Sequence, residues 1–226
     1  MKKLFLTLPL LLLLTTSSVA QQPKEPIDAK AKGILDELSA KTKACGAIKS
    51  EFLIENFGTD KKLKETNTGK LTSKGQKYIV EFKGQKIVCD SKTQWTIIEE
   101  SKEVQMNDAP DQKSGDQINP TNIFTLYEKN FKYKFEKEET VNGALMQVVN
   151  LYPLDPSKKA YHTVKLYIDK TKKQLALVKI LNKDATSVTI TVKSYSCYTE
   201  PNDAIFTVTK KEYPSPPWEW IDLKEN

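Results

Sequence analysis

Apolar and polar residues alternate in short segments along most of the chain after Gly46, and turn residues separate these segments. In the segment KYIVEF, Tyr78, Val80 and Phe82 fall on one side of an extended chain, and Ile79 falls on the other. An Asn-Gly pair between two such segments, at positions 142–143, is typical of a β-hairpin. The alternation predicts antiparallel strands joined by short turns. We expect about ten strands and two helices, arranged as one large curved sheet or incomplete barrel with the helices packed inside or across it.

Two segments show helical spacing instead. Asp28 is suited to cap a helix that runs to about Thr42, in which Ile34, Leu35 and Leu38 form one apolar stripe. A second, shorter helix is expected after Asn119 and Pro120, which are typical of a helix start. Its apolar residues are Ile123, Phe124, Leu126 and Tyr127. A helix that is apolar over most of its circumference is expected to cover another part of the molecule.

The first twenty residues have the three parts of a secretory signal peptide. Lys2 and Lys3 precede an apolar run from Leu4 to Leu14, and Ser18-Val19-Ala20 forms a small-residue cleavage site. We predict cleavage after Ala20, with residues 21–226 forming one domain. An uncleaved membrane anchor is the alternative, but the run is shorter than the roughly 20 residues that span a bilayer. Gln21 follows the cleavage site, so we expect no lipid-modified cysteine there and a soluble mature protein.

All 35 basic residues are lysine, and the formal net charge is +6. Without arginine, the chain has no guanidinium group for bidentate recognition of phosphate or carboxylate. The lysines are interleaved with acidic residues, which predicts a solvated surface and no nucleic-acid partner. The three cysteines, Cys45, Cys89 and Cys197, allow at most one disulfide, and the sequence leaves the pairing open.

The sequence contains few groups that could perform catalysis. His162 is the only histidine, and no serine or carboxylate near it forms a recognisable catalytic motif. The acidic pairs at 99–100 and 138–139 fall at expected strand ends or turns, where carboxylates are solvated. One histidine and three scattered cysteines have no metal-binding spacing, and no glycine-rich phosphate loop follows a strand. We therefore expect a protein that is not an enzyme and has no catalytic residue, metal or cofactor.

Several segments, taken in order, resemble the periplasmic outer-membrane lipoprotein carrier family (LolA). They are AKGILDELSAKTKACGAIKSEFLIENF, TGKLTSKGQKYIVEF and, most clearly, IVCDSKTQWTIIEESKEVQM, which includes a strand bearing Trp95. The segment INPTNIFTLYEKNFKYKF is similar to the lid-helix region of the family's Bacteroidetes-type branch, and DAIFTV resembles its closing strand. The resemblance covers nearly the whole mature chain. It implies an incomplete antiparallel β-barrel with a helical lid over an apolar cavity.

In that family the cavity holds the acyl chains of a lipoprotein. The resemblance therefore implies a monomeric periplasmic carrier that takes acylated lipoproteins from an inner-membrane lipoprotein-releasing ABC-type complex to an outer-membrane receptor. Well-known members hold the lid shut with an arginine, whereas Gly75 falls near that position here, flanked by Lys74 and Lys77. Either lysine could take the arginine's place, although neither forms a guanidinium fork. Otherwise lid closure rests on the apolar residues of the second helix.

We expect side chains from the sheet and from both helices to line the cavity. They are Phe52, Ile54, Tyr78, Val80, Phe82, Trp95 and Ile97 from the sheet, and Ile34, Leu38, Phe124 and Leu126 from the helices. The same side chains could instead fill an ordinary core, and a shift of one residue would exchange the two faces of a strand.

Three other functions fit the same sequence: an envelope regulator that senses lipoproteins, a structural or adhesive envelope protein with a filled barrel, and a hydrolase that uses His162. The alternating Trp218 and Trp220 near the C-terminus are expected either to pin the tail to the barrel or to contact a partner.

Overall fold

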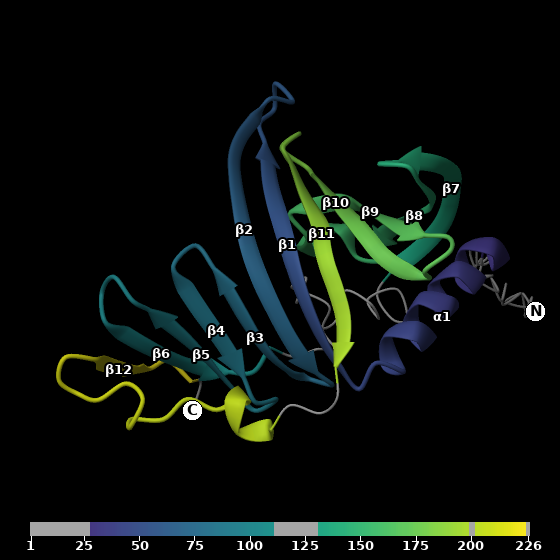
Figure 1. Cartoon of the computed structure of the whole chain (residues 1–226). Coiled ribbons are helices and arrows are strands. Elements are labelled where there is room, and N and C mark those ends of the chain that lie inside the picture. The colour runs from purple at the N-terminus through teal and green to yellow at the C-terminus, as the bar shows by residue number, and fades with distance from the viewer. Residues whose placement is uncertain (1–27, 111–130, 199–201, 225–226) are drawn as a thin grey trace, which may run out of the picture.

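The computed structural model describes residues 28–110, 131–198 and 202–224 of the chain. Twelve strands form one sheet in the order β12-β6-β5-β4-β3-β2-β1-β11-β10-β9-β8-β7. Figure 1 shows that this sheet is strongly curved and open, so it does not close into a barrel. The predicted signal peptide, and the predicted short helix with Phe124 and Leu126, lie outside the described residues.

Within the described residues, one α-helix precedes the strands, and two short 3₁₀ helices interrupt their succession. In chain order the elements are α1 (Ala29–Lys43), β1 (Ala47–Phe57), β2 (Leu63–Lys74), β3 (Lys77–Phe82), β4 (Gln85–Cys89), β5 (Thr93–Ile98), β6 (Glu103–Asp108), β7 (Phe131–Val141), β8 (Ala144–Pro153), η2 (Pro156–Lys158), β9 (Tyr161–Asp169), β10 (Gln174–Asn182), β11 (Ser187–Tyr198), η3 (Asp203–Phe206) and β12 (Glu219–Asp222).

Neighbouring strands pair in antiparallel fashion throughout the sheet, except that β12 runs parallel to β6. The predicted antiparallel architecture is therefore confirmed, with two strands more than the ten expected. Asn142 and Gly143 join β7 to β8, and both have positive φ, 50° and 79°. Positive φ at both turn residues matches the twist of the flanking strands, which is why an Asn-Gly pair forms such hairpins.

Helix α1 begins where the sequence predicts. One oxygen of the Asp28 carboxylate, Oδ1, accepts a hydrogen bond from the backbone N–H of Ala31 at 2.9 Å, and so caps the helix. The other oxygen, Oδ2, accepts from the backbone N–H of Phe135 in β7, also at 2.9 Å. A single side chain therefore both starts α1 and ties it to the sheet. These backbone hydrogen bonds lower the pKa of Asp28.

The apolar stripe of α1 packs on one face of the sheet, over β7–β10 (Figure 1). Ile34, Leu35 and Leu38 are buried there against residues of β8, β9 and β10. The sheet residues in this core are Val149, Leu151, Val164, Leu166, Ile168, Leu175 and Val178. We call the face that carries α1 the α1 face, and the opposite one the outer face.

The C-terminal segment differs from its prediction. Asp203 to Val208 was expected to form a last short strand, but Asp203–Phe206 forms the 3₁₀ helix η3, capped by the side chain of Asn202. The tail beyond η3 contains a strand, β12, that pairs with β6. The segment packs on the outer face of the sheet through Val208 and Trp218. Helix η3 is held by contacts with a distant part of the sheet, and β12 has no alternation of apolar and polar residues. Neither element was therefore predictable from its local sequence.

One disulfide joins Cys45, just after α1, to Cys197 near the end of β11, with the two Cα atoms 4.9 Å apart. Cys89 is free and buried, and burial raises the pKa of its thiol. The disulfide thus links the helix to the central part of the sheet. Of the helices within the described residues, none has the length and apolar composition needed to cross a bilayer.

Candidate functional site

The hydrogen-bond register assigns strand residues to one face of the sheet or the other, because directly paired residues point the same way. Ile190 of β11 packs against the core under α1, and it pairs with Ile54 of β1. Phe52, two residues before Ile54, pairs with Gly69 of β2, which in turn pairs with Phe82 of β3. These residues therefore lie on the α1 face. Tyr78 and Val80 lie there too, because they are four and two residues before Phe82 in the same strand.

Among the described residues, α1 covers one half of the α1 face, and no helix packs on the other half. Under α1, the residues of β8 and β9 are closed off from solvent; Val149, Leu151, Val164 and Leu166 are all 0% exposed. Over β1–β4 and β11, several apolar side chains on the same face remain partly exposed. They are Phe52, Ile54, Phe82, Ile87, Val188, Ile190 and Val192, which we call the apolar band. Tyr78, Val80 and Leu71 form the buried floor beside it.

Most lysines of the strands around the apolar band lie on the outer face of the sheet. Where β1 is paired from Ile48 to Asn56, and across the described strands β2–β6 opposite it, the α1-face positions contain no lysine. The outer face of these strands carries Lys49, Lys70, Lys74, Lys77 and Lys86. An ammonium group beside apolar surface loses hydration. The pairing therefore keeps these five lysines away from the band. Lys83, in the turn after β3, does reach it, because its Nζ lies 5.6 Å from the centroid of the Phe82 ring.

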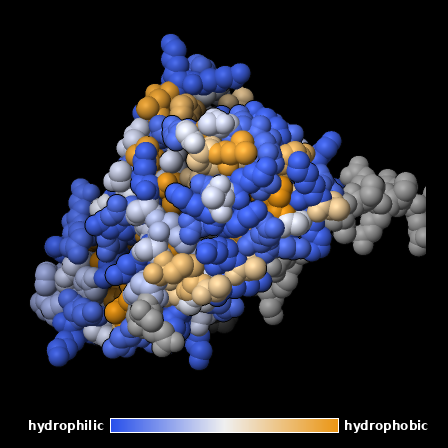
Figure 2. All heavy atoms as spheres, turned by 45° about the vertical axis from the view of Figure 1, so that its right-hand side comes forward, coloured by the Kyte–Doolittle hydropathy of each residue, from blue (hydrophilic) through white to orange (hydrophobic). Residues whose placement is uncertain are grey.

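Figure 2 shows how hydrophilic and hydrophobic residues are distributed on one side of the molecule. Hydrophilic residues (blue) dominate this view, and hydrophobic residues (orange) are exposed between them in several places, including the area below the hydrophilic tip at the top.

Gly69 of β2 lies in close contact with the ring of Phe52, a member of the band. A Cβ atom added to Gly69 would lie 2.4 Å from both Cε2 and Cζ of the Phe52 ring, and 2.9 Å from the carbonyl oxygen of Glu81. The ring of Phe52 therefore lies directly over the glycine, in space that any other side chain would occupy. This contact sets the orientation of one of the two phenylalanine rings in the band.

Trp95 and Ile97 do not line this face, so grouping them with Tyr78 was wrong. Tyr78 pairs with Cys89, and Cys89 pairs with Gln94, so Gln94 shares the α1 face and Trp95 points the opposite way. Trp95 and Ile97 are buried on the outer face, where the C-terminal segment covers them through Val208 and Trp218. The C-terminal segment covers the outer face of β5, so the more apolar set of β5 residues does not mark the α1 face.

Ile34 and Leu38 also differ from the expectation that they line a cavity. They are 6% and 1% exposed and pack in the closed core between α1 and the sheet, which is the ordinary role considered for them. Phe124 and Leu126 lie outside the described residues. The remaining predicted residues, Phe52, Ile54, Tyr78, Val80 and Phe82, come together on the α1 face, where binding by them stays a prediction.

Several residues of the band were missed. Ile87 of β4 and Val188, Ile190 and Val192 of β11 lie on the α1 face beside the predicted residues. In β11, the sequence SVTITV alternates Val and Ile with Ser and Thr, which was a usable signal. The pairing of β11 with β1, more than 130 residues earlier in the chain, was not readable from the sequence.

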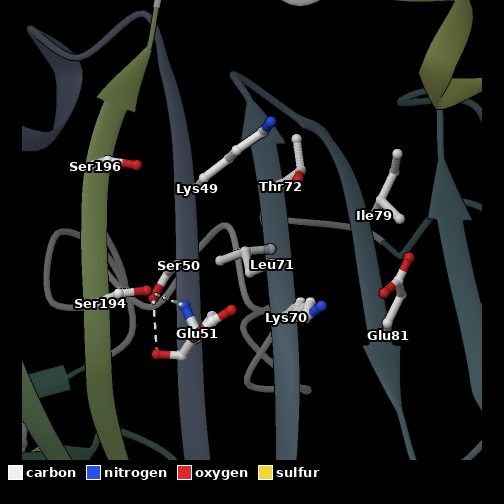
Figure 3. Close-up of a pocket in the computed structure, with 10 residues that line it drawn as sticks. All are labelled: Lys49, Ser50, Glu51, Lys70, Leu71, Thr72, Ile79, Glu81, Ser194 and Ser196. Carbon is white, nitrogen blue, oxygen red and sulfur yellow. Dashed lines mark hydrogen bonds between the residues drawn. The ribbon is translucent and has the colours of Figure 1, made fainter.

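The outer face carries a different, polar depression, shown in Figure 3. It encloses about 380 Å³ and is shallow. The residues around it include Lys49 and Glu51 of β1, Lys70 of β2, Glu81 of β3, and Ser194 and Ser196 of β11. Ser194 Oγ accepts a hydrogen bond from the backbone N–H of Glu51 at 3.1 Å, where the pairing of β1 with β11 shifts by one residue. Interspersed charges of both signs do not favour an apolar ligand here.

Lys74 and Lys77, the expected substitutes for the lid arginine, both bind Asp203. Lys74 Nζ lies 2.8 Å from Asp203 Oδ1, and Lys77 Nζ lies 2.7 Å from Asp203 Oδ2. The hydrogen bond from Lys74, followed by that from Lys77, lowers the pKa of Asp203 to about 2. These lysines therefore hold the C-terminal segment to the turn between β2 and β3.

His162 is exposed on β9, as expected for a surface strand residue. Its Nδ1 lies 2.8 Å from the Thr163 hydroxyl. Within the described residues, no carboxylate is hydrogen-bonded to the ring, so the arrangement lacks the orienting acid that a Ser-His-Asp site uses.

No protein-family model and no curated protein matches the sequence. Among solved structures, an uncharacterized conserved protein from Thermus thermophilus aligns with a TM-score of 0.56 and 13% identity, over 87% of this chain and 99% of that one. What the two share is the fold. The LolA superfamily protein NE2245 from Nitrosomonas europaea aligns with a TM-score of 0.44 and 13% identity, over 79% of this chain and 97% of that one.

The MucA/MucB complex of Pseudomonas aeruginosa aligns with a TM-score of 0.49 and 14% identity, over 81% of this chain and 62% of that one. The sequence resemblance predicted structural neighbours from the LolA superfamily, and such a protein is among them. The Bacteroidetes-type branch of that family stays a prediction.

Proposed function

We propose that this protein binds the acyl chains of lipoproteins on the apolar band and carries them through the periplasm. In this proposal it receives them from an inner-membrane lipoprotein-releasing ABC-type complex and passes them to an outer-membrane receptor. The observation that carries the proposal is the partly exposed apolar band on one face of an open sheet, where five lysines of the paired strands β1–β4 lie on the opposite face.

The energetics of an acyl chain favour such a carrier. Exposing a chain to water costs about 0.8 kcal/mol per CH₂, so one tail of about sixteen carbons carries roughly 10 kcal/mol. A soluble carrier must cover that surface with apolar side chains while its own outside stays polar. In this protein the apolar band would cover the acyl chain, and the lysine-rich outer face of the same sheet would stay in contact with water.

Transfer to a receptor requires a difference in affinity between the two proteins, and no covalent chemistry. The receptor must bind the same tails more tightly, or its contact must favour a state of the carrier that holds them less tightly. Periplasmic location rests on the signal peptide predicted for residues 1–20, and it is part of the same proposal.

Native mass spectrometry tests the proposal with a triacylated lipoprotein and the same lipoprotein stripped of its acyl chains. We expect a one-to-one complex with the acylated form alone. Ile54→Asp is expected to weaken this complex, because Ile54 belongs to the band. Leu53→Asp is the matched control, since Leu53 is the adjacent residue, is also partly exposed and faces the other side of β1.

Each variant is checked by circular dichroism and thermal unfolding, so that binding is compared between folded proteins. Absence of a complex with the acylated form would refute the proposal. Equal weakening by both aspartate substitutions would show that the band is not the binding surface.

A further inference from the structure

Along part of the boundary between β4 and β5 the α1 face changes from apolar to polar, whereas at one end polar Gln85 of β4 pairs with apolar Ile98 of β5. Ile87 of β4 pairs with Thr96 of β5, and Thr96 pairs with Gln105 of β6. One step along the strands, Gln94 of β5 pairs with Asn107 of β6. The four residues Gln94, Thr96, Gln105 and Asn107, which we call the polar strip, are partly exposed and adjoin the apolar band across one strand boundary.

The side chains of the strip retain unused hydrogen-bonding groups. Tyr78 Oη donates to Gln94 Oε1 at 2.7 Å, which uses the acceptor of that amide and leaves its NH₂ group as a donor. Gln105 Nε2 donates to Glu103 Oε2 at 3.0 Å, which leaves Gln105 Oε1 as an acceptor. The side chains of Thr96 and Asn107 make no hydrogen bond to another residue in the described part of the chain.

The strip itself is uncharged. The α1-face positions of β5 and β6 contain no lysine, and the one ionisable side chain at their end is the carboxylate of Glu103. A phosphate or free carboxylate placed here would lack a cation and would lie near a carboxylate. Neutral carbonyl groups suit the amide and hydroxyl donors better, because they accept hydrogen bonds without carrying charge.

We propose that the polar strip binds the ester and amide carbonyls that join the acyl chains to the N-terminal cysteine of a lipoprotein. This inference rests on the proposed function, since it assumes that the tails occupy the apolar band. A lipid tail that enters the band brings its carbonyl groups out of water, and a buried carbonyl without a hydrogen bond is unfavourable. The strip lies where the apolar surface ends, so it can supply those hydrogen bonds.

The test compares two probes with tails of equal length. One is a diacylated lipopeptide whose tails are attached through esters, and the other is the same peptide with its tails attached through ethers, so that both carry the same charge. The variant Gln94→Leu/Asn107→Leu removes the amides at two paired positions. The control variant Gln94→Asn/Asn107→Gln keeps an amide at each.

The double leucine variant is expected to bind the carbonyl-containing lipopeptide about tenfold more weakly, the effect of losing one well-made hydrogen bond in a desolvated site. Its affinity for the ether probe is expected to change less than about threefold. The amide-retaining variant is expected to keep most of the affinity for the carbonyl-containing probe. Thermal unfolding of each variant confirms that the compared proteins are folded.

Three results would overturn the inference, and they differ in whether they also contradict the proposed function. If the double leucine variant loses the same affinity for both probes, or loses affinity for neither, the strip does not bind carbonyl groups. The proposed function would be unaffected by either result. Failure of the wild-type protein to bind either probe would remove the proposed function together with the strip.

Discussion

Phe52 of β1 and Gly69 of β2 are directly paired across the sheet, and the ring of Phe52 lies over the glycine. Glycine weakens a strand when nothing packs on it, and an aromatic ring from the neighbouring strand can offset that loss. The contact also places the ring in the apolar band. One pair of residues therefore connects the stability of β2 with the shape of the proposed binding surface.

Gly69→Ala tests this contact. The new methyl group would lie 2.4 Å from the Phe52 ring and 2.9 Å from the backbone carbonyl of Glu81, so the ring and the backbone must both shift. We expect the free energy of unfolding to fall by roughly 1–3 kcal/mol, the usual cost of overpacking, and acyl-chain binding to weaken. Urea unfolding and the lipopeptide titration measure the two effects.

The control for this substitution is Gly33→Ala in α1. A Cβ added at Gly33 meets nothing within 4 Å, and alanine favours a helix interior over glycine. We expect a gain of about 0.5–1 kcal/mol, with binding unchanged. A gain in stability at position 69 as well would contradict the close approach of Phe52.

Asp203 predicts a pH effect on the attachment of the C-terminal segment. Its pKa is about 2 in the folded protein, below the ordinary value of 3.8, because Lys74 and Lys77 hydrogen-bond to its charged form. Since the folded-state pKa is depressed, the ion pairs add stability above about pH 4 and lose it as the pH falls through the folded pKa. Asp203→Asn is expected to unfold at a lower temperature than the wild type at pH 6, and at nearly the same temperature near pH 2.

Thermal unfolding of both proteins from pH 6 to pH 2 measures this difference. The side chain of Asp203 is about half exposed, so added salt should also reduce the difference at pH 6. A difference that stays constant down to pH 2 would rule out the carboxylate as its source.

The cysteines predict a defined pattern of thiol reactivity. With Cys45 and Cys197 joined and Cys89 free and buried, the native protein should react slowly with a thiol reagent. Unfolding without reductant should expose one thiol, and unfolding with reductant should expose three. Two reactive thiols in the oxidised, unfolded protein are not possible with this pairing, and three would mean that the disulfide is absent.

Replacing both bonded cysteines by serine should lower the free energy of unfolding. The bond joins residues 152 positions apart, and bonds that close long loops typically contribute about 2–4 kcal/mol by restricting the unfolded chain. Urea unfolding of the Cys45→Ser/Cys197→Ser protein, compared with the wild type under oxidising conditions, measures this contribution. Identical midpoints would show that the bond adds no stability.

Substitution of Trp218 tests whether the outer face contributes to stability alone or also to acyl-chain binding. It is 9% exposed, packs with Trp95, Ile97 and Val104, and meets the Tyr213 ring edge-on at 4.7 Å between centroids. Trp218→Ala is expected to cost about 3 kcal/mol of stability through the cavity it leaves. Acyl-chain affinity of the folded variant should change little, because the side chain lies on the face opposite the band.

Chemical unfolding and lipopeptide titration of Trp218→Ala, at a temperature where the variant is folded, check both statements. A large loss of affinity without loss of stability would place the binding surface on the outer face. In that case Trp95 and Ile97 would belong to the site, as the sequence pattern predicts.

Local patterns in the sequence were sufficient for most of the elements. Helix α1 follows from its cap at Asp28 and its stripe of Ile34, Leu35 and Leu38, and the β7–β8 hairpin follows from Asn142-Gly143. These features depend on contacts between residues that are close in sequence, so spacing and turn chemistry are enough to predict them. The antiparallel character of the sheet follows in the same way from the period of two.

The tertiary structure decided which face each strand residue occupies, which cysteines pair, and where the tail binds. Trp95 and Tyr78 are both apolar strand residues, yet they lie on opposite faces because Tyr78 pairs through Cys89 with Gln94. The outer face could bury Trp95 only because Trp218, more than 120 residues later, covers it. Burial depends on all the chain that packs around a side chain, and alternation within one strand contains no information about that distant cover.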